Sequence, residues 1–226
     1  MDTRDLIKLD IISDVACPWC YVGKGYLDRA LEARPDHPFQ IEWHPYRLNP
    51  EMPEGGIDRE EYMRLKFGDV DGIIRVHKPL LEHAAKAGIA FDLPAIKRSP
   101  QSLDAHRLIH WAGLEGRQTP MVSALFRAYW REGRDIGDRA VLADIAGEVG
   151  LDKAMIERLL ASDADRAEIA ARDAHARQRG VTGVPTFVLA QRHVLQGAQP
   201  TETWLEVIDE LTALLKDQDQ DRGGAE

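Results

Sequence analysis

Cys17-Pro18-Trp19-Cys20 contains both cysteines of the 226-residue chain, and only residues 13–16 separate it from the apolar run of residues 6–12. The branched apolar residues of that run are typical of a buried strand, and residues 13–16 lead into a turn. A helix is predicted from about Pro18 to residue 34, because proline suits a first helical turn and apolar residues then recur at helical spacing. The two thiols are therefore predicted to lie on the first turn of a helix.

The predicted position of Cys17 at a helix start gives its sulfur a distinct chemistry. Unpaired backbone N–H groups and the helix dipole favour negative charge there, so a thiolate is stabilised over a thiol. Cys17 is therefore the predicted nucleophile. Cys20 lies one turn further on, close enough to attack a mixed disulfide formed at Cys17, and is the predicted resolving thiol.

The cysteine pair also allows three structural interpretations. A structural disulfide is disfavoured, because a loop closed over residues 17–20 constrains little of the unfolded chain. Zinc needs about four ligands, and no second CxxC and no H-x3-5-H pair completes such a site. Two inert buried cysteines would share this spacing and this place at a helix start only by coincidence. Redox chemistry is the favoured interpretation.

Composition limits the function classes. The chain is 44% hydrophobic and 30% charged, which is ordinary for a soluble globular protein. A formal net charge of −9 without a basic cluster argues against nucleic acid or an anionic membrane as a partner. Charged residues interrupt any signal-peptide core in the first twenty positions, and no apolar run reaches membrane-spanning length. We expect a cytoplasmic protein, and a reducing compartment favours a catalytic role for the cysteines.

The middle of the chain is predicted to be helical. Residues 39–46 alternate apolar and polar positions as a half-covered strand does, and residues 49–56 have loop composition. From there to about residue 162 no strand pattern is found, and Pro79 predicts a kink or a break. Glycines separate the helical candidates, which are residues 58–67, 70–87, 102–115, 118–131, 138–149 and 152–161.

The end of the chain returns to mixed structure. A helix over residues 164–179 is followed by Val184-Pro185 and a buried strand at 186–189. A second strand at 193–196 completes a hairpin, and an amphipathic helix covers 201–215. The polar residues 217–226 are predicted to be a disordered tail.

This order of elements resembles the thioredoxin fold, and the helical block between its halves resembles the DsbA-like arrangement. The likeness covers residues 7 to 215. Within that superfamily, five separated motifs are similar to the FrnE-type branch, namely residues 13–24, 43–50, 66–68, 105–108 and 183–187.

The resemblance implies an α/β protein, a thioredoxin fold with a large all-helical insertion. It predicts a discontinuous thioredoxin-like domain formed by residues 1–57 and 163–216. The inserted helical domain is predicted to span residues 58–162.

The resemblance also implies roles for residues near the thiols. Pro185 is expected to be a cis proline beside both sulfurs, leaving Val184 to offer backbone hydrogen bonds to an extended substrate. Base rates alone favour an ordinary trans proline that opens an edge strand. His106 is expected to line the cleft over the thiols and to stabilise the Cys17 thiolate. Its place beside an apolar helical face equally suits a structural histidine.

Further contacts are expected around the cysteines. Pro18 and Trp19 are assigned to substrate binding, with Trp19 exposed as an apolar patch between the thiols. The Pro18-Trp19 pair also influences the reduction potential, which spans about 150 mV among CxxC proteins of the same spacing. Asn49 and Lys66 are assigned to the site by the resemblance alone.

The expected function is a cytoplasmic dithiol/disulfide oxidoreductase that acts on protein or small-molecule thiols and disulfides. No tightly bound cofactor and no metal are expected, and glutathione is a candidate thiol donor. One alternative is a glutathione-dependent enzyme of the 2-hydroxychromene-2-carboxylate isomerase or kappa-class transferase type. Those proteins have serine where Cys17 stands here, and a serine cannot form a mixed disulfide. The other alternative is a noncatalytic peptide-binding or chaperone module.

Overall fold

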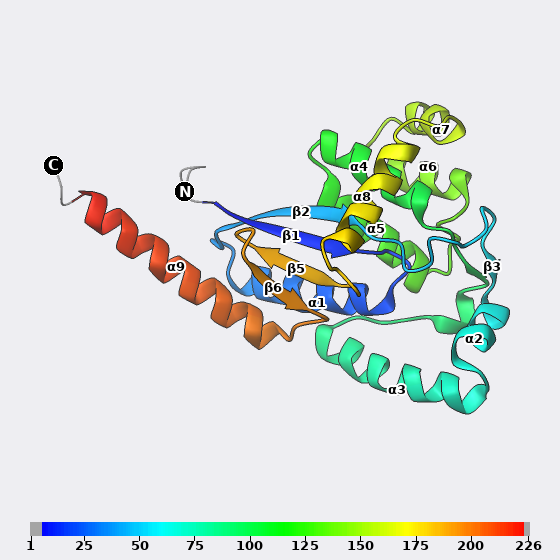
Figure 1. Ribbon diagram of the computed structural model, residues 1–226, viewed down its shortest axis with the longest axis horizontal. Helices are drawn as coiled ribbons and strands as arrows, with labels where there is room; N and C mark the ends of the chain where they lie inside the picture. The colour runs from blue at the N-terminus through cyan, green and yellow to red at the C-terminus, as the bar shows by residue number, and fades with distance from the viewer. Residues whose placement is uncertain (1–5, 224–226) are drawn as a thin grey trace.

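The structure is a computed structural model that describes residues 6–223, with side chains described as far as residue 217. Its centre is a four-stranded sheet in the order β2-β1-β5-β6 (Figure 1). β1 (Ile7–Ser13) runs parallel to β2 (Phe39–Pro45) and antiparallel to β5 (Thr186–Leu189). β6 (His193–Gln196) pairs antiparallel with β5 at one edge. The two ends of the chain therefore meet in one sheet.

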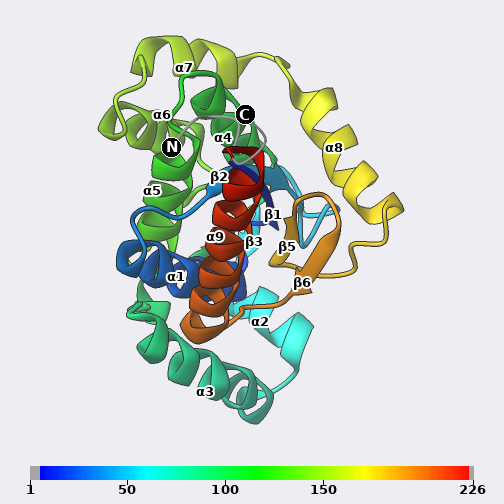
Figure 2. The same cartoon turned by 90° about the vertical axis from the view of Figure 1, so that its left-hand side faces the viewer.

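Aromatic and branched side chains hold the sheet to its helices. Ile11 lies between Trp43 and Phe187 in the register, and all three are buried. α1 (Pro18–Ala33) packs against α9 (Thr201–Gly223), whose buried Trp204 contacts Phe187 edge to face. Figures 1 and 2 show that α9 begins near β6 and α1, and Figure 1 shows it extending past the end of the sheet. This packing stabilises β1 and α1, whose junction carries the cysteines.

In the sequence, the helical block lies between β2 and β5, the last strand of the first half of the sheet and the first strand of the second. Aspartates cap several of its helices by accepting backbone N–H bonds, as Asp58 does for α2 and Asp138 for α6. The helices are α2 (Arg59–Phe67), α3 (Val70–Ala87), the 3-10 turn η2 (Leu93–Ala95), α4 (Leu103–Leu114), α5 (Gln118–Trp130), α6 (Arg139–Glu148) and α7 (Lys153–Ala161), and α8 (Arg166–Gln178) leads back to the sheet.

Helix α5 is tied directly to the sheet edge. The Gln118 amide accepts the N–H of Trp43 at 2.9 Å and donates to its carbonyl at 3.1 Å, so it pairs backbone groups on the outer side of β2. Buried residues form one continuous apolar cluster through the sheet, α1, α4, α5 and α6. The division into two domains at residues 57/58 and 162/163 stays a prediction.

Two features of the helical block differ from the sequence prediction. α3 runs through Pro79 without the break that was one of the two predicted outcomes, because its buried face (Leu80, Ala84 and Ala87) packs on neighbouring elements and offsets the missing hydrogen bond. Short paired strands, β3 (Ile57–Asp58) and β4 (Arg98–Ser99), lie in the region predicted to be without strands. Two residues are too few to show an alternating pattern.

The last helix is longer than predicted. α9 continues to Gly223, although disorder is predicted from residue 217. Residues 216–222 contain neither glycine nor proline, and adding turns to an anchored helix requires no new nucleation. Residues 224–226 of the predicted tail lie outside the described residues. Within the described range, no helix is both long and apolar enough to cross a membrane.

Candidate active site

The two cysteines lie where β1 passes into α1. Cys17 is the N-cap residue of α1 with an extended backbone (φ −95°, ψ 117°), and Pro18 occupies the first turn. Cys17 and Cys20 are free thiols that approach each other to 3.5 Å. Their exposed fractions are only 4% and 1%. This separation is short enough for a disulfide to form after a small movement of the side chains.

A loop far away in the sequence closes over the nucleophile. The Val184–Pro185 peptide bond is cis, and the Cys17 thiol donates to the Val184 carbonyl at 3.7 Å. α1 approaches this loop closely at Gly23, where an added Cβ would lie 3.0 Å from Cγ of Pro185. The structure thus brings together Cys17, Cys20, Val184 and Pro185, four of the residues that the sequence analysis assigned to the site.

The environment of Cys20 keeps it a thiol. Burial raises its pKa well above the ordinary value, and the adjacent Cys17 raises it further. The Ser13 hydroxyl and the Asp14 amide N–H act in the opposite direction but do not offset the burial. Cys20 is therefore protonated at neutral pH.

The turn between β1 and the cysteines is held by Asp14, which is 1% exposed. Its carboxylate accepts the N–H of Ala16 at 3.0 Å and of Leu48 at 2.8 Å, and its carbonyl accepts the N–H of Cys17 at 2.9 Å. Burial acts to raise the pKa of Asp14, but the interactions with His106 and the two amides outweigh it and hold that pKa below the ordinary value. A buried carboxylate thus fixes the backbone that presents Cys17.

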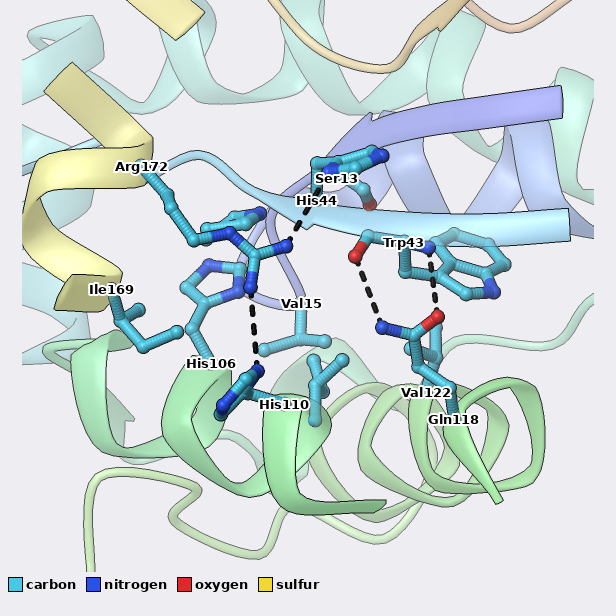
Figure 3. A pocket seen from close by; sticks show the side chains of 12 residues that line it. Ser13, Val15, Trp43, His44, His106, His110, Gln118, Val122, Ile169 and Arg172 are labelled. Atoms are coloured by element: carbon cyan, nitrogen blue, oxygen red, sulfur yellow. Dashed lines mark hydrogen bonds between the residues drawn. The ribbon is translucent and has the colours of Figure 1, made fainter. Parts of the chain in front are cut away.

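His106 stands behind this turn. Its Nε2 lies 3.5 Å from Oδ1 of Asp14 and 3.2 Å from the Tyr46 carbonyl. Among residues 6–223 it has no hydrogen bond with either cysteine, and it lines a small cavity together with Ser13 and Val15 (Figure 3). The structure therefore connects His106 to Cys17 through Asp14, and a direct role of His106 over the thiols stays a prediction.

Trp19 is half-buried, although the sequence analysis expects it to be exposed. Its ring packs edge-on against His83 of α3, with ring centres 5.4 Å apart. The same imidazole shares a 3.0 Å hydrogen bond with the Tyr26 hydroxyl. Sequence reasoning missed His83, although its spacing of three residues from Leu80 places it near the buried face of α3. Pro18 is also half-buried.

Asn49 and Lys66 meet at one hydroxyl group. The Asn49 amide donates to the Tyr62 hydroxyl at 2.9 Å, and the Lys66 ammonium donates to it at 2.8 Å. In the part of the chain that the structure describes, neither side chain has a hydrogen bond with Cys17 or Cys20. Their assignment to the site stays a prediction, and the tyrosine that joins them is a residue that sequence reasoning missed.

A second group of titratable side chains lies on the sheet, formed by Asp10, Glu42 and His44. The Lys8 ammonium already pairs with Asp10 at 3.1 Å and with Glu42 at 2.8 Å. Nε2 of His44 lies 2.6 Å from Asp10. Because a protein cation occupies the space between the carboxylates, this cluster is a network of ion pairs.

Comparisons with known proteins agree with this geometry. A family model, the DSBA-like thioredoxin domain, matches residues 8–209. The chain is similar to a probable DsbA oxidoreductase from Streptomyces coelicolor, with a TM-score of 0.79 and 29% identity over 92% of this chain and 90% of that one. It is also similar to YwbO, an uncharacterized protein of Bacillus subtilis, with 25% identity over 90% of this chain and 96% of that protein.

More distant structures share the fold. The cytosolic disulfide reductase DsbM from Pseudomonas aeruginosa, solved with GSH, has a TM-score of 0.63 and 24% identity, covering 94% of this chain and 99% of that one. A 2-hydroxychromene-2-carboxylate isomerase has a TM-score of 0.68 and 18% identity, covering 95% and 98%. At these identities the likeness shows a common fold. Because the family model matches most of its length, the chain belongs to the DSBA-like thioredoxin domain family.

Proposed function

We propose that this protein is a dithiol/disulfide oxidoreductase in which Cys17 attacks and Cys20 resolves. The observation that carries the proposal is the pair of free thiols, 3.5 Å apart, at the start of α1 beside the Val184–Pro185 loop. Membership of the family supports an oxidoreductase or isomerase. The two cysteines favour the first of these.

The reaction follows from the positions of the two sulfurs. The Cys17 thiolate attacks one sulfur of a substrate disulfide, forms a mixed disulfide and releases the other half as a thiolate. Cys20 then attacks the Cys17 sulfur, releases the second half and leaves an internal disulfide. A thiol donor restores the dithiol, and we propose glutathione for this role. Burial keeps Cys20 protonated, so it reacts second.

We propose that the backbone of Val184 binds an extended substrate. Its carbonyl accepts the Cys17 S–H in the dithiol form. When Cys17 becomes a thiolate or part of a mixed disulfide, this hydrogen bond is lost and the carbonyl is free to accept an N–H from a substrate strand. We propose that Pro18 and the accessible part of Trp19 contact the same substrate.

A glutathione-dependent isomerase is the second candidate, because a 2-hydroxychromene-2-carboxylate isomerase shares the fold. Such an activity would persist in Cys17→Ser, whereas disulfide exchange would not. A peptide-binding chaperone role would likewise survive the loss of Cys17. The fold shared with a cytosolic disulfide reductase supports our further proposal that the protein works in the reducing cytoplasm, on thiols or disulfides. The net charge of −9 supports the proposal that it does not act on nucleic acid or membranes.

Insulin reduction with dithiothreitol as donor tests the proposal. We expect the wild-type protein to accelerate the reaction and Cys17→Ser to lose all of that acceleration. Cys20→Ser is expected to be stalled as a mixed disulfide. No acceleration by the wild type, together with glutathione binding that persists in Cys17→Ser, would favour the isomerase instead.

A further inference from the structure

Trp19, between the two cysteines, packs against a helix of the inserted block. Its indole ring meets the His83 imidazole of α3 edge-on, with ring centres 5.4 Å apart and ring planes at 65°. Part of the Trp19 side chain is buried against the core and part remains accessible. Because Cys17 is only 4% exposed, a substrate disulfide must pass the residues around it to reach its sulfur. The accessible part of Trp19 is one of the surfaces beside that approach.

His83 contacts two aromatic rings of α1. Trp19 and Tyr26 are seven residues apart, which places them on the same face of that helix. The imidazole shares a 3.0 Å hydrogen bond with the Tyr26 hydroxyl, and the centres of these two rings are 6.2 Å apart. A tyrosine hydroxyl can donate to a neutral imidazole or accept from a charged one, so this bond is available in either state of His83.

The helix that carries His83 is packed on α1. Figures 1 and 2 both show α3 next to α1, and the two helices are in contact. Just beyond the end of α3, the Ile89 side chain lies so close to Gly25 of α1 that a Cβ added to the glycine would be 2.5 Å from Cδ1 of Ile89. The imidazole is thus fixed by the backbone of α3 at one end and by the Tyr26 hydroxyl at the other.

His83 acts on the active site through Trp19. Among residues 6–223 it has no hydrogen bond with Cys17 or Cys20, and its contact with the cysteine motif is the ring of Trp19. An indole that packs against a fixed ring has fewer accessible rotamers than a free one. A binding surface that is already ordered loses less conformational entropy when a ligand packs on it.

We propose that His83 is a positioning residue, which holds the Trp19 ring as a binding surface for an apolar side chain next to the disulfide of a peptide substrate. This inference rests on the proposed oxidoreductase function and concerns which disulfides the protein prefers. The accessible part of the indole supplies apolar contact area. The protein is therefore expected to prefer disulfides whose cysteines have apolar neighbours in the peptide.

Two peptide disulfides measure this preference. Each joins two copies of a short peptide, with phenylalanine on both sides of the cysteine in one and alanine in the other. Each copy carries a fluorophore that is quenched until the disulfide is reduced. With dithiothreitol as donor, initial rates above the uncatalysed rate give kcat and KM. We define the selectivity as kcat/KM for the phenylalanine peptide divided by kcat/KM for the alanine peptide, and expect it to be at least about threefold for the wild type.

Two variants with the tryptophan contact removed test the role of His83. His83→Ala frees the Trp19 ring, and we expect it to lower the selectivity by roughly threefold or more, through a higher KM for the phenylalanine peptide. Its selectivity should approach that of Trp19→Ala, which lacks the surface itself and is expected to have a selectivity of about one.

A pair of variants separates the ring contact from the hydrogen bond. His83→Asn keeps an acceptor for the Tyr26 hydroxyl but has no ring, so we expect it to be as unselective as His83→Ala. The double variant Tyr26→Phe/His83→Phe has no hydrogen bond but keeps both rings. Because an apolar pair of similar shape replaces the polar one, we expect it to retain the wild-type selectivity within about twofold.

His37→Ala is a matched control for loss of a histidine that packs on an aromatic ring. The His37 and Phe39 rings lie 5.8 Å apart. Phe39 pairs with Ile7 at the start of β1, whereas Cys17 follows the end of that strand, so the control lies at the far end of the sheet from the thiols. We expect His37→Ala to have the wild-type selectivity.

Near-UV circular dichroism reports the order of the Trp19 ring without any substrate. We take the Trp19 signal as the difference between each protein and the same protein with Trp19→Phe. We expect this signal to weaken in His83→Ala and His83→Asn and to persist in the double variant, while far-UV spectra show that all of them are folded.

Three results would overturn the inference without contradicting the oxidoreductase proposal. The first is a wild-type protein that turns over both peptides with a selectivity of about one. The second is wild-type selectivity in His83→Ala and His83→Asn, which would show that Trp19 needs no support from His83. The third is a double variant as unselective as His83→Ala, which would assign the effect to the hydrogen bond. Turnover of neither peptide by the wild type would instead contradict the proposed function itself.

Discussion

Replacing Asp14 by asparagine keeps the size of the side chain and removes its charge. In the folded protein the two carboxylate oxygens accept the N–H groups of Ala16 and Leu48 and face His106. An asparagine has one carbonyl oxygen, so its NH2 group must face one of these donors. One charge-assisted hydrogen bond is lost, and one buried N–H is left without an acceptor.

The expected loss of stability follows from these contacts. A hydrogen bond to a charged group contributes about 1.5–3 kcal/mol, and an unpaired buried donor costs about 1–3 kcal/mol. The smaller desolvation cost of a neutral amide offsets part of this sum. We therefore expect Asp14→Asn to lower the free energy of unfolding of the reduced protein by about 2–4 kcal/mol at pH 7.

The loss should depend on pH in a defined direction. The pKa of Asp14 is lowered in the folded state, so its stabilisation is complete above the unfolded value of about 3.9 and is lost as the pH falls through the folded value. Asparagine does not titrate. The difference between wild type and variant is therefore constant from about pH 5 to pH 7 and shrinks below about pH 4.

Urea unfolding at pH 7, at pH 5 and near pH 3 measures this difference. Asp138→Asn is a matched control, because Asp138 also accepts two backbone N–H groups but is exposed, and asparagine is an equally good helix cap. We expect the control to change stability by less than about 0.5 kcal/mol. A loss of that size for Asp14→Asn at pH 7, or a loss that persists unchanged near pH 3, would refute the assigned role of Asp14.

Three further substitutions test the surroundings of the site. Arg107 is fully buried and donates to three backbone carbonyls and to Asp104. We expect Arg107→Lys to lower the free energy of unfolding in urea by about 3 kcal/mol or more, and a loss below about 1 kcal/mol would contradict this. Trp204→Ala removes the ring contacts that Trp204 of α9 makes with Phe39 and Phe187 of the sheet. We expect it to lower the free energy of unfolding by about 3–5 kcal/mol in the same assay. Gly23→Val places methyl groups against Pro185 and is expected to slow the reaction of Cys17 with the chromogenic disulfide DTNB, followed by the coloured thiolate it releases, at least about tenfold. An unchanged rate would show that the loop moves freely.

The sequence predicted the parts of the site that depend on local structure. Two cysteines separated by two residues at a helix start must lie on one turn, so the closeness of Cys17 and Cys20 follows from the motif. The approach of Val184 and Pro185 to Cys17 joins positions 167 residues apart. Only the resemblance to a known family, and not periodicity, predicted that contact.

Contacts between side chains on different elements were beyond the sequence. Periodicity placed His106 beside a buried face but not next to Asp14, and it gave no reason to pair Trp19 with His83. The unbroken helix at Pro79 shows a similar limit, since tertiary packing outweighs a local preference. The thioredoxin fold with its helical insertion is confirmed, while the roles of individual side chains at the site depend on the experiments described above.

The mass of the protein after reaction with oxidised glutathione tests the central claim most directly. We expect Cys20→Ser to carry one glutathione, on Cys17, and Cys17→Ser to carry none, while the wild type ends as an internal disulfide without an adduct. A Cys17→Ser protein that carries glutathione on Cys20, or a Cys20→Ser protein that carries none, would contradict the account in which Cys17 attacks and Cys20 resolves.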